Sequence, residues 1–289
     1  MRKVLVILFA AALSFALQAQ TVPFAIIQPF ADNLALGGAH TASPSALPQE
    51  SGTVEAGIGK TFWQTKALSL NLTNFMLRIK ALDALSFGIE YTSDTMAEYE
   101  TFDAGGNSSG TYQPNEMYIG ANVWIRPVDA LCFRAAGRYI RSSLAPDSDA
   151  QCFAADLAGI YRIAGIVNTG FEIRNLGGKL DYGYGEYPLP TTFTAGAYGA
   201  FPIAGKHKAE AALDAGVMPA YGTMLISGGA GYIYNDMIAV RSGVHISTNG
   251  SVMPTYFSFG VFFVSKILDI GAAYLTAAQT YSLSARIRL

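Results

Sequence analysis

The sequence has few charged side chains. Asp, Glu, Lys and Arg make up 14% of its 289 residues, whereas soluble domains contain about 25%. Acidic residues outnumber basic ones, 21 against 19, and the formal net charge is −2. A nucleic-acid-binding domain carries an excess of basic residues, so we expect no nucleic-acid partner. The hydrophobic share is 51% and the mean hydropathy is +0.27, which favours a chain with much of its surface in lipid.

Long apolar runs are nearly absent as well. The exception, Val4–Leu17, follows Arg2 and Lys3 and precedes the small residue Ala19, which is the three-part design of a secretory signal peptide. We therefore predict that residues 1–19 direct Sec-type export and are then removed. An N-terminal anchor helix is the alternative, although this run of fourteen residues is too short to span a bilayer as a helix. No later segment has the roughly 18–20 consecutive apolar residues of a membrane helix.

Cysteine is scarce. Cys132 and Cys152 fall on neighbouring predicted strands joined by a loop near Ser142–Asp149, the first far from that loop and the second close to it. In an antiparallel pair they would be several residues out of register, beyond the Cα separation that a disulfide allows. Although an exported protein can form disulfides, we predict two free thiols.

Catalytic and metal-binding motifs are missing from the sequence. The three histidines are scattered and do not have metal-ligand spacing. Gly57–Thr61 resembles part of a phosphate loop, but the glycine that the motif requires earlier is replaced by Val54, and no helical pattern follows. Gly228–Gly231 lies inside an alternating run, so it cannot form a dinucleotide-binding turn. We expect a protein that is not an enzyme and that uses no cofactor or metal.

What the sequence does contain is alternation. It has 30 Gly, 17 Phe and 16 Tyr, a composition typical of all-β membrane proteins. In Thr280–Leu289 apolar residues alternate strictly with polar ones, and the polar face carries Arg286 and Arg288. This period of two predicts a β-strand. Since the chain ends on it, we expect it to close a transmembrane barrel, with apolar side chains toward lipid and polar ones toward the lumen.

Similar runs continue from Ser51 onward, about fourteen in all, most with the ~9–11 residues that a tilted membrane strand needs. They are Thr53–Lys60, Thr65–Lys80, Asp83–Thr92, Asn115–Arg126, Asp129–Arg141, Ala150–Arg162, Gly165–Asn175, Pro190–Phe201, Lys206–Val217, Gly222–Tyr234, Asp236–Ser247, Met253–Phe263, Lys266–Leu275 and Thr280–Leu289. Tight turns alternate with longer, more polar loops, as in barrels whose short turns face the periplasm. We predict an all-β fold, a transmembrane antiparallel β-barrel of about fourteen strands over residues 51–289, in the outer membrane of the cell.

Charged side chains fall on the faces of these runs opposite the apolar residues, so we expect a lumen with both signs of charge. The candidate lumen charges are Glu90, Arg134, Arg138, Asp156, Glu172, Arg174, Glu210, Asp214, Arg241 and His245. They could flank a ligand, or they could solvate and cross-brace the interior. Trp63, Trp124, Phe201 and Tyr234 lie near strand ends, where we expect aromatic girdles at the membrane interfaces.

Residues 20–50 differ from the rest of the chain. This segment alternates poorly and contains Pro23, Pro29, Pro44 and Pro48, yet it is too apolar for a free tail. We predict a short plug packed inside the barrel mouth. The alternative is a periplasmic leader strand or linker.

One predicted strand breaks its phase. Leu70 and Leu72 share one parity, whereas Leu77 and Ile79 take the other. The slip falls at Thr73, Asn74 and Phe75. One extra residue there predicts a β-bulge, which is either a purely structural feature or a wall defect through which an apolar ligand or a partner reaches the barrel side.

Two stretches resemble a known family. Residues 170–180, together with Leu189-Pro190 and residues 192–198, resemble the "NLG … LP … R-G-A-Y" stretch of the PorV/PorQ family, with Thr194 where a basic residue is common. Residues 36–39 resemble the "ALGGA" element near the mature N-terminus of that family. The residues that carry the likeness are Gly37, Gly38, Asn175, Leu176, Gly177 and Pro190.

The resemblance implies a FadL-like barrel of fourteen strands in the outer membrane. Some members of the family serve the type IX secretion system, as a shuttle or attachment-complex subunit that receives secreted cargo. We therefore expect a non-enzymatic barrel that acts through secretion-system proteins or exported cargo in type IX protein secretion or surface attachment. The alternative is a FadL-like transporter of small hydrophobic compounds across the outer membrane.

Two long loops, Glu98–Pro114 and Leu176–Leu189, are the natural partner surfaces, because aromatic residues are favoured at protein interfaces. Their aromatic residues are Tyr99, Phe102, Tyr112, Tyr182, Tyr184 and Tyr187. The same loops could equally be exposed without a partner.

Overall fold

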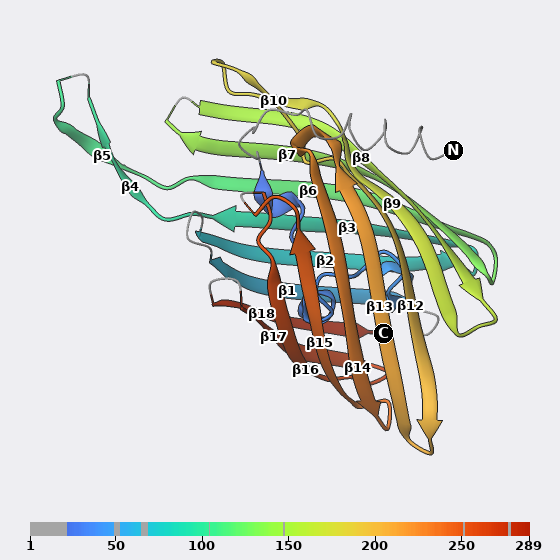
Figure 1. The fold of residues 1–289 in the computed structure, drawn as a ribbon. Helices are drawn as coiled ribbons and strands as arrows, with labels where there is room; N and C mark the ends of the chain where they lie inside the picture. The colour runs from blue at the N-terminus through green and yellow to red at the C-terminus, as the bar shows by residue number, and fades with distance from the viewer. Residues whose placement is uncertain are drawn as a thin grey trace, which may run out of the picture.

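The wall of the molecule is a closed barrel of antiparallel strands (Figure 1). The computed structural model describes residues 22–48, 53–64, 69–103, 105–146, 148–250, 252–276 and 279–289, so the predicted signal peptide lies outside the described residues. Fourteen strands of the described chain close the barrel, in the order β1-β18-β17-β16-β15-β14-β13-β12-β9-β8-β7-β6-β3-β2. Each neighbouring pair is antiparallel. The predicted fold class and strand number are confirmed.

The strands of the barrel have the following bounds. They are β1 Val54–Gln64, β2 Ser69–Leu82, β3 Leu85–Thr95, β6 Asn115–Val128, β7 Leu131–Ala145, β8 Ser148–Ile163, β9 Val167–Gly177, β12 Thr192–Ala204, β13 His207–Met218, β14 Thr223–Tyr234, β15 Ile238–Ser247, β16 Tyr256–Phe263, β17 Leu268–Leu275 and β18 Thr280–Arg288. Two small hairpins are β4 Tyr99–Phe102 with β5 Ser108–Tyr112, and β10 Lys179–Asp181 with β11 Glu186–Pro188. The short helices are η1 Pro23–Ala25, α2 Ala31–Ala35, η2 Pro44–Ala46 and η3 Pro219–Tyr221. No helix in the described ranges is long and apolar enough to cross a membrane.

Side chains alternate between the outside and the inside of the wall. On β16 the burial changes at every residue. Each barrel strand exposes at least one large apolar side chain on the outside. Examples in chain order are Ile58, Phe75, Ile89, Ile119, Phe133, Leu157, Phe171, Phe193, Leu213, Ile226, Val240, Phe259, Ile270 and Leu283. An apolar band that continues around the whole barrel is the surface that lipid covers in outer-membrane barrels.

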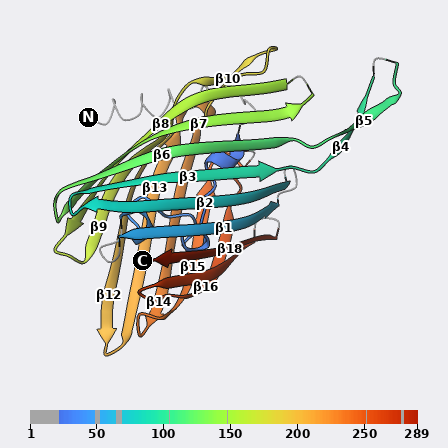
Figure 2. The same ribbon diagram turned by 180° about the vertical axis from the view of Figure 1, so that it is seen from behind.

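The two ends of the barrel are built differently. At one end tight turns join β2 to β3, β6 to β7, β8 to β9, β12 to β13, β14 to β15 and β16 to β17. The last residue, Leu289, lies at the same end and hydrogen-bonds to Thr53 and Val54. The connections at the other end are mostly longer and include both hairpins, of which β4–β5 projects far beyond the wall in Figures 1 and 2. We call these the short-turn end and the long-loop end, and the first faces the periplasm by the usual rule.

One predicted long loop, Ser142–Asp149, is mostly strand. β7 and β8 run past their predicted ends, so that Ser143 pairs with Asp149 and Ala145 with Ser148. The serines resemble loop residues in the sequence, but the hydroxyl groups of Ser142 and Ser143 both have hydrogen-bond partners in other strands. Ser142 donates to Glu116 at 2.6 Å. A buried polar group needs a hydrogen-bond partner of this kind, and with one the strand can continue through serine residues.

The prediction of a bulge at Thr73, Asn74 and Phe75 is wrong. β2 pairs with β1 in continuous register from Ser69 to Ile79, and with β3 in continuous register from Leu72 to Lys80. Leu70 and Leu72 face inward, where they are buried against the N-terminal segment, whereas Phe75 faces lipid. The strand therefore keeps its phase, and what changes along it is the polarity of the interior. Because the bulge is absent, the structure gives no support for the wall opening that we considered at these residues.

The N-terminal segment 22–48 occupies the interior of the barrel, as the blue ribbon in Figure 1 shows. Its helix α2 packs against β15, β16, β17 and β18. Phe24 and Leu34 are buried in one apolar cluster with Leu70 and Ile140 of the wall. This arrangement agrees with the predicted plug rather than with a periplasmic leader strand or linker. We call residues 22–48 the plug.

The four aromatic residues near strand ends divide between two environments. Phe201 and Tyr234 are exposed at the short-turn end, as predicted for an interfacial girdle. Trp63 and Trp124 are buried inside the barrel, and the indole N–H of Trp124 donates to the carbonyl of Ala46 in the plug at 3.3 Å. The girdle prediction is wrong for both tryptophans, because the plug provides an apolar partner on the inside of the wall.

The two cysteines lie on the β7–β8 pair. Cys132 is opposite Ile160 and Cys152 is opposite Ile140. Both thiols are buried and free, which confirms the prediction from strand register.

Candidate functional site in the barrel interior

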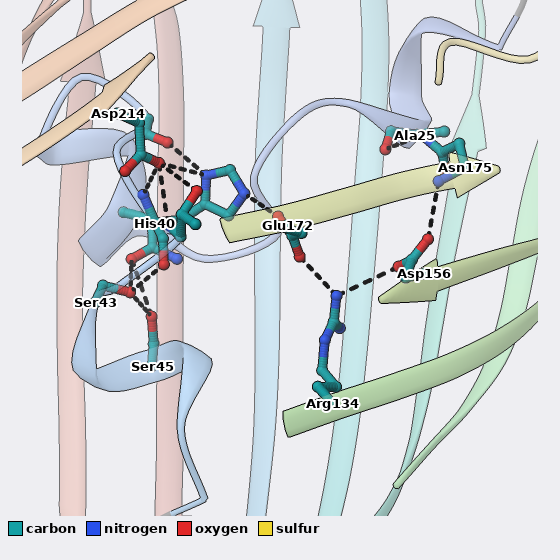
Figure 3. Close-up of polar contacts among 12 residues, drawn as sticks. Ala25, His40, Ser43, Ser45, Arg134, Asp156, Glu172, Asn175 and Asp214 are labelled. Carbon is teal, nitrogen blue, oxygen red and sulfur yellow. Dashed lines mark hydrogen bonds and ion pairs between the residues drawn. The ribbon is translucent and has the colours of Figure 1, made fainter. Parts of the chain in front are cut away.

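Inward-facing charges on β3, β7, β8 and β9 form one chain of ion pairs. Arg138 joins Glu90 (Nε to Oε1, 2.7 Å) to Asp156 (Nη2 to Oδ2, 2.9 Å). Arg134 joins Asp156 (3.4 Å) to Glu172 (2.6 Å) through its Nη2 atom (Figure 3). Residues four apart on a strand share a face, which places both arginines on the inside of β7. The structure thus brings together five of the candidate lumen charges.

The chain of ion pairs continues into the plug through His40 (Figure 3). Its Nε2 lies 2.7 Å from Oε2 of Glu172 on β9, and its Nδ1 lies 3.4 Å from Oδ2 of Asp214 on β13. The same Asp214 oxygen accepts the backbone N–H groups of His40 (2.8 Å) and Thr41 (3.0 Å). Burial lowers the pKa of His40, but the two carboxylates outweigh burial and hold the pKa above its ordinary 6.5. Ion pairs from His40 to β9 and β13 therefore hold the plug against the wall.

A second group of charges lies along β13, β15 and β18. Arg241 binds Glu210 through Nε (2.6 Å) and Nη2 (3.1 Å). The hydroxyl of Tyr198 donates to the same carboxylate at 2.7 Å. Arg286 binds Asp32 in α2 at 2.6 Å, so this group also ends on the plug.

Sequence reasoning found the wall residues of this interior but not those of the plug. All ten candidate lumen charges face inward, and Arg286 could have been added from the polar face of the last run. His40 and Asp32 lie in a segment without periodicity, so no sequence signal marks them. Their partners are Glu172 and Arg286, which are more than a hundred residues away in the chain.

Asn175 interrupts the pairing of β8 with β9. Ala155 pairs with Leu176, but Leu157 pairs with Ile173, so β9 has one extra residue here. The φ of Asn175 is +54°, a left-handed conformation that asparagine tolerates better than most residues. The barrel therefore contains a bulge within β9, at a place that the sequence analysis did not predict, and none at Thr73–Phe75 of β2.

The side chain and backbone of Asn175 tie this bulge to its surroundings (Figure 3). Its backbone N–H donates to Oδ1 of Asp156 at 2.9 Å. Its side-chain amide donates to the carbonyls of Ala25 in the plug (3.4 Å) and Pro190 (3.3 Å), and it accepts from Arg138 (3.2 Å). The family-like residues Asn175 and Pro190 thus shape the wall and hold the plug.

Of the remaining family-like residues, the three glycines stand where a side chain or an ordinary backbone conformation does not fit. A Cβ on Gly177 would lie 2.3 Å from the carbonyl oxygen of Phe153, so a side chain has no room there. Leu176, next to it, faces outward and is exposed. Gly37 and Gly38 have φ of +72° and +87°, which favour glycine.

The plug turn at Gly37 lies directly on the backbone of the wall. The residues of the wall that face this turn are three glycines, which have no side chain. They are Gly229 on β14, Gly243 on β15 and Gly260 on β16. A Cβ on Gly243 would lie 2.2 Å from the backbone nitrogen of Gly37. The hydroxyl of Ser258 accepts from that nitrogen (3.1 Å) and donates to the carbonyl of Ala35 (3.0 Å). The plug is therefore seated backbone against backbone.

Three of the cavities that the described residues enclose lie beside the plug and follow it through the barrel. The upper cavity, about 50 Å³, lies toward the long-loop end beside Thr192 and Met253. The middle cavity has a volume of about 100 Å³, and the lower cavity, about 260 Å³, reaches Asp269 and Arg288 near the short-turn end. Neighbouring cavities share lining residues. Gln28, His40 and Arg174 line both the upper and the middle cavity, and Asn33, Ser45 and Arg286 line both the middle and the lower.

Two candidate lumen residues stand outside the ion-pair chains. His245 bonds to the hydroxyl of Ser227 through Nδ1 (2.8 Å) and stacks on Tyr256, while its Nε2 has no partner among the described residues. Arg174 is 6% exposed, and its Nε atom has no hydrogen-bond partner among the described residues, although its charge interacts with Glu172. Both side chains line the upper cavity.

No family model and no curated protein matches the sequence. Solved structures do match. The toluene transporter TodX of Pseudomonas putida is 13% identical, with a TM-score of 0.59 over 89% of this chain and 96% of that chain. The toluene transporter TbuX of Ralstonia pickettii is 13% identical, with a TM-score of 0.60 over 92% and 100%. The CymD monoaromatic hydrocarbon channel is 13% identical, with a TM-score of 0.62 over 91% and 98%. This chain shares their fold.

The shared fold agrees with the FadL-like barrel that the sequence resemblance implies. The outer membrane protein Omp33 of Acinetobacter baumannii, 9% identical, also matches, with a TM-score of 0.51 over 82% of this chain and 98% of that chain. Together with the continuous apolar band, this likeness identifies a barrel of the cell outer membrane.

Proposed function

We propose that this barrel carries small hydrophobic compounds across the outer membrane. The supporting observation is an apolar interior at the long-loop end, directly above the cavities. Trp63, Leu70 and Leu72 of the wall are buried there with Phe24 and Ile27 of the plug. A hydrophilic pore is polar along its whole lumen, whereas apolar side chains at the mouth give a hydrophobic solute a favourable place to leave water.

A lid of the same character covers this mouth. Leu180, Tyr182 and Leu189, in and beside the β10–β11 hairpin, are buried in the same apolar cluster, and the Tyr182 hydroxyl donates to Ser142 on β7 at 2.7 Å. The neighbours of known structure include two toluene transporters and a monoaromatic hydrocarbon channel. Both points favour hydrophobic transport over the secretion role.

The test is uptake of two solutes of similar size. Cells that produce the barrel, and cells of the same strain without it, are given radiolabelled toluene or radiolabelled glycerol. We expect the barrel to accelerate toluene entry several-fold and glycerol entry little. Equal acceleration of both solutes would identify a simple pore, and no acceleration of toluene would contradict the proposal.

A role in type IX secretion or surface attachment, as in some PorV/PorQ proteins, is the second candidate. The observation in its favour is the projecting β4–β5 hairpin, which exposes Tyr99 and Phe102. The other predicted partner loop is less suitable, because Tyr182 is buried in the lid and only Tyr184 is largely exposed. If this role holds, secretion-system proteins or exported cargo bind mainly through β4–β5.

Purification from the native outer membrane in mild detergent tests this second candidate. The intact chain is compared with a variant that lacks residues 98–113. Secretion subunits or cargo that co-purify in stoichiometric amount with the intact chain, and not with the variant, would support it. A barrel that purifies alone in both cases would contradict it.

A further inference from the structure

Two buried acids face each other at the long-loop end of the barrel. Asp94, near the end of β3, and Glu116, near the start of β6, are directly opposite in the β3–β6 pair. Both side chains point into the barrel and are 0% and 2% exposed. Residues placed in this way have Cβ atoms about 4.5–5.5 Å apart, and like charges there repel. The two acids therefore need a cation or a proton between them.

The described residues supply no cation to this pair. Oδ1 of Asp94 accepts the backbone N–H of Asn71 at 2.6 Å, but its Oδ2 and the Oε2 of Glu116 have no hydrogen-bond partner among the described residues. The charge of Lys60 reaches Asp94, yet this lysine is on the outer face of β1 and donates to Thr73 at 2.7 Å. One oxygen of each acid is thus left unpaired inside the barrel.

Other titratable groups on the elements around the pair are hydroxyls, a thiol or members of ion pairs. They are Glu90 and Arg138, bound to each other; Asp32 and His40 of the plug, bound to Arg286 and Glu172; Arg141 and Asp149, paired on the outside; and Tyr112, Tyr118, Cys152 and Tyr182. No group of three or more His, Cys, Asp or Glu that could hold a metal ion occurs among the described residues. Two carboxyl groups that share a site without a cation hold one proton between them.

Hydrogen bonds connect the acid pair to the lid. Oε1 of Glu116 accepts the hydroxyl of Ser142 at 2.6 Å, and the Ser142 oxygen accepts the hydroxyl of Tyr182 at 2.7 Å. Tyr182 is buried, and the charge of Glu116 reaches it. The lid therefore covers a site that needs water once both acids are charged.

The pair lies above the lipid-facing band, because polar side chains face outward at this level of the wall. They are Ser93 and Thr95 on β3 and Asn115 on β6. Burial raises the pKa of both carboxyl groups, to about 6 for Asp94 and about 7 for Glu116, and the charge of Asp94 also raises the pKa of Glu116. With the lid closed, the second proton of the pair therefore leaves near neutral pH.

We propose that Asp94 and Glu116 share one proton while the lid is closed, and that loss of this proton to water opens the lid. Two charges here would repel each other without water around them, and movement of the β10–β11 hairpin away from the mouth would hydrate both. The closed state thus holds one proton more than the open state. Its stability is complete below the ordinary carboxyl pKa of about 4 and decreases as the pH rises through the raised values. This device does not depend on which solute passes beneath the lid.

Cys152 can report the position of the lid. It is buried in one apolar cluster with Leu180 and Tyr182, and a Cβ on Gly178, next to the hairpin, would lie 3.2 Å from the Cβ of Cys152. In a Cys132→Ala background it is the only cysteine of the chain. The experiment measures its rate of reaction with dipyridyl disulfide, on the purified full-length barrel in detergent with EDTA, from about pH 5 to about pH 8.

The test variants are Asp94→Asn and Glu116→Gln. Each replaces one acid by an amide of the same shape, whose N–H can donate to the remaining carboxylate, so we expect the lid to stay closed at every pH. The wild-type rate divided by the variant rate at the same pH is free of the titration of the thiol itself. This ratio should rise at least tenfold between about pH 5 and about pH 8. A misfolded variant would react faster, not slower, and so could not imitate this result.

Two controls are matched to these variants. Asp149→Asn changes an exposed acid at the same end of the barrel and should react like the wild type at each pH. Cys132 is buried with Leu47 and Trp124, away from the lid, so in a Cys152→Ala background Glu116→Gln should not change its rate. A ratio that stays flat from about pH 5 to about pH 8 would overturn the proposal. So would an Asp149→Asn variant as slow as Glu116→Gln.

Discussion

At the scale of single residues, the close seating of the plug makes Gly243 sensitive to one added methyl group. Its Cβ would lie 2.2 Å from the backbone nitrogen of Gly37, whereas a Cβ on Gly137 meets nothing within 4 Å. We predict that Gly243→Ala displaces the plug, at a cost of about 1–3 kcal/mol, as for other overpacked sites. Proteolysis of the folded barrel should cut the plug faster in this variant. Gly137→Ala, the same change on the outer face, should behave as wild type, and equal rates in the two variants would contradict the seating.

The His40 contacts predict a pH dependence of plug binding. Glu172 and Asp214 raise the pKa of His40 above 6.5, against the effects of burial and of Arg174. A pKa raised in the bound state contributes stability that is complete below pH 6.5 and is lost as the pH rises through the raised value. Hydrogen exchange of residues 36–42, followed from about pH 6 to about pH 9 and corrected for the intrinsic rate, should therefore show weaker protection at high pH.

The control for this measurement is His40→Gln, which removes the titration but keeps a side chain that can hydrogen-bond. Its protection should not change over the same pH range. A wild-type profile that is equally flat would show that the His40 ion pairs do not hold the plug.

At the scale of elements, the β9 bulge depends on one residue with two separable roles. Asn175 adopts a φ of +54° and also makes side-chain hydrogen bonds to Ala25, Pro190 and Arg138. Asn175→Gly keeps the backbone conformation and loses those bonds, each of which contributes about 0.5–1.5 kcal/mol. Asn175→Ala loses the bonds and adds about 1–2 kcal/mol of backbone strain.

We therefore predict that resistance to unfolding decreases in the order wild type, Asn175→Gly, Asn175→Ala. Urea-induced unfolding rates of the three proteins in the same detergent test the order. If the glycine variant unfolds as fast as the alanine variant, then the left-handed backbone conformation at residue 175 does not contribute to stability, and the prediction is contradicted.

The strands of the wall could be predicted from the sequence because each has one face toward lipid. The residues on that face must be apolar, so apolar residues recur at every second position. The prediction of a bulge on β2 was wrong because it used the same alternation of apolar and polar residues that predicted the strands correctly. The prediction assumed a polar lumen along its whole depth, but Leu70 and Leu72 face an apolar plug. Local pattern alone cannot distinguish a shifted strand from a strand whose inner environment changes.

At the scale of the whole molecule, the position of the plug inside the lumen predicts that it limits the permeability of the barrel. Deleting residues 22–48 should join the three cavities into one open lumen and raise single-channel conductance in planar bilayers several-fold. Deleting residues 98–113, which lie in the projecting loop outside the lumen (Figure 1), should leave conductance unchanged. Similar conductance in both deletion variants would mean that the wall, not the plug, limits passage.

The interior shows where prediction from sequence ends. The alternation along each strand predicted that Arg134, Arg138 and Glu172 face the interior, because the side to which a residue points depends only on its position in its own strand. Their pairing with one another and with His40 depends on strand register and on the path of the plug. Both arise only when the barrel closes, so they could not be predicted from residue spacing.

The glycine seat also constrains the order of assembly. Gly37 is near the start of the chain, whereas Gly229, Gly243 and Gly260, on which its turn rests, are in the last quarter. A seat without clearance cannot be entered by threading a finished plug into a finished barrel. We therefore expect the plug to take its place before β18 pairs with β1. On this order of assembly, closing the barrel and filling its lumen would occur together.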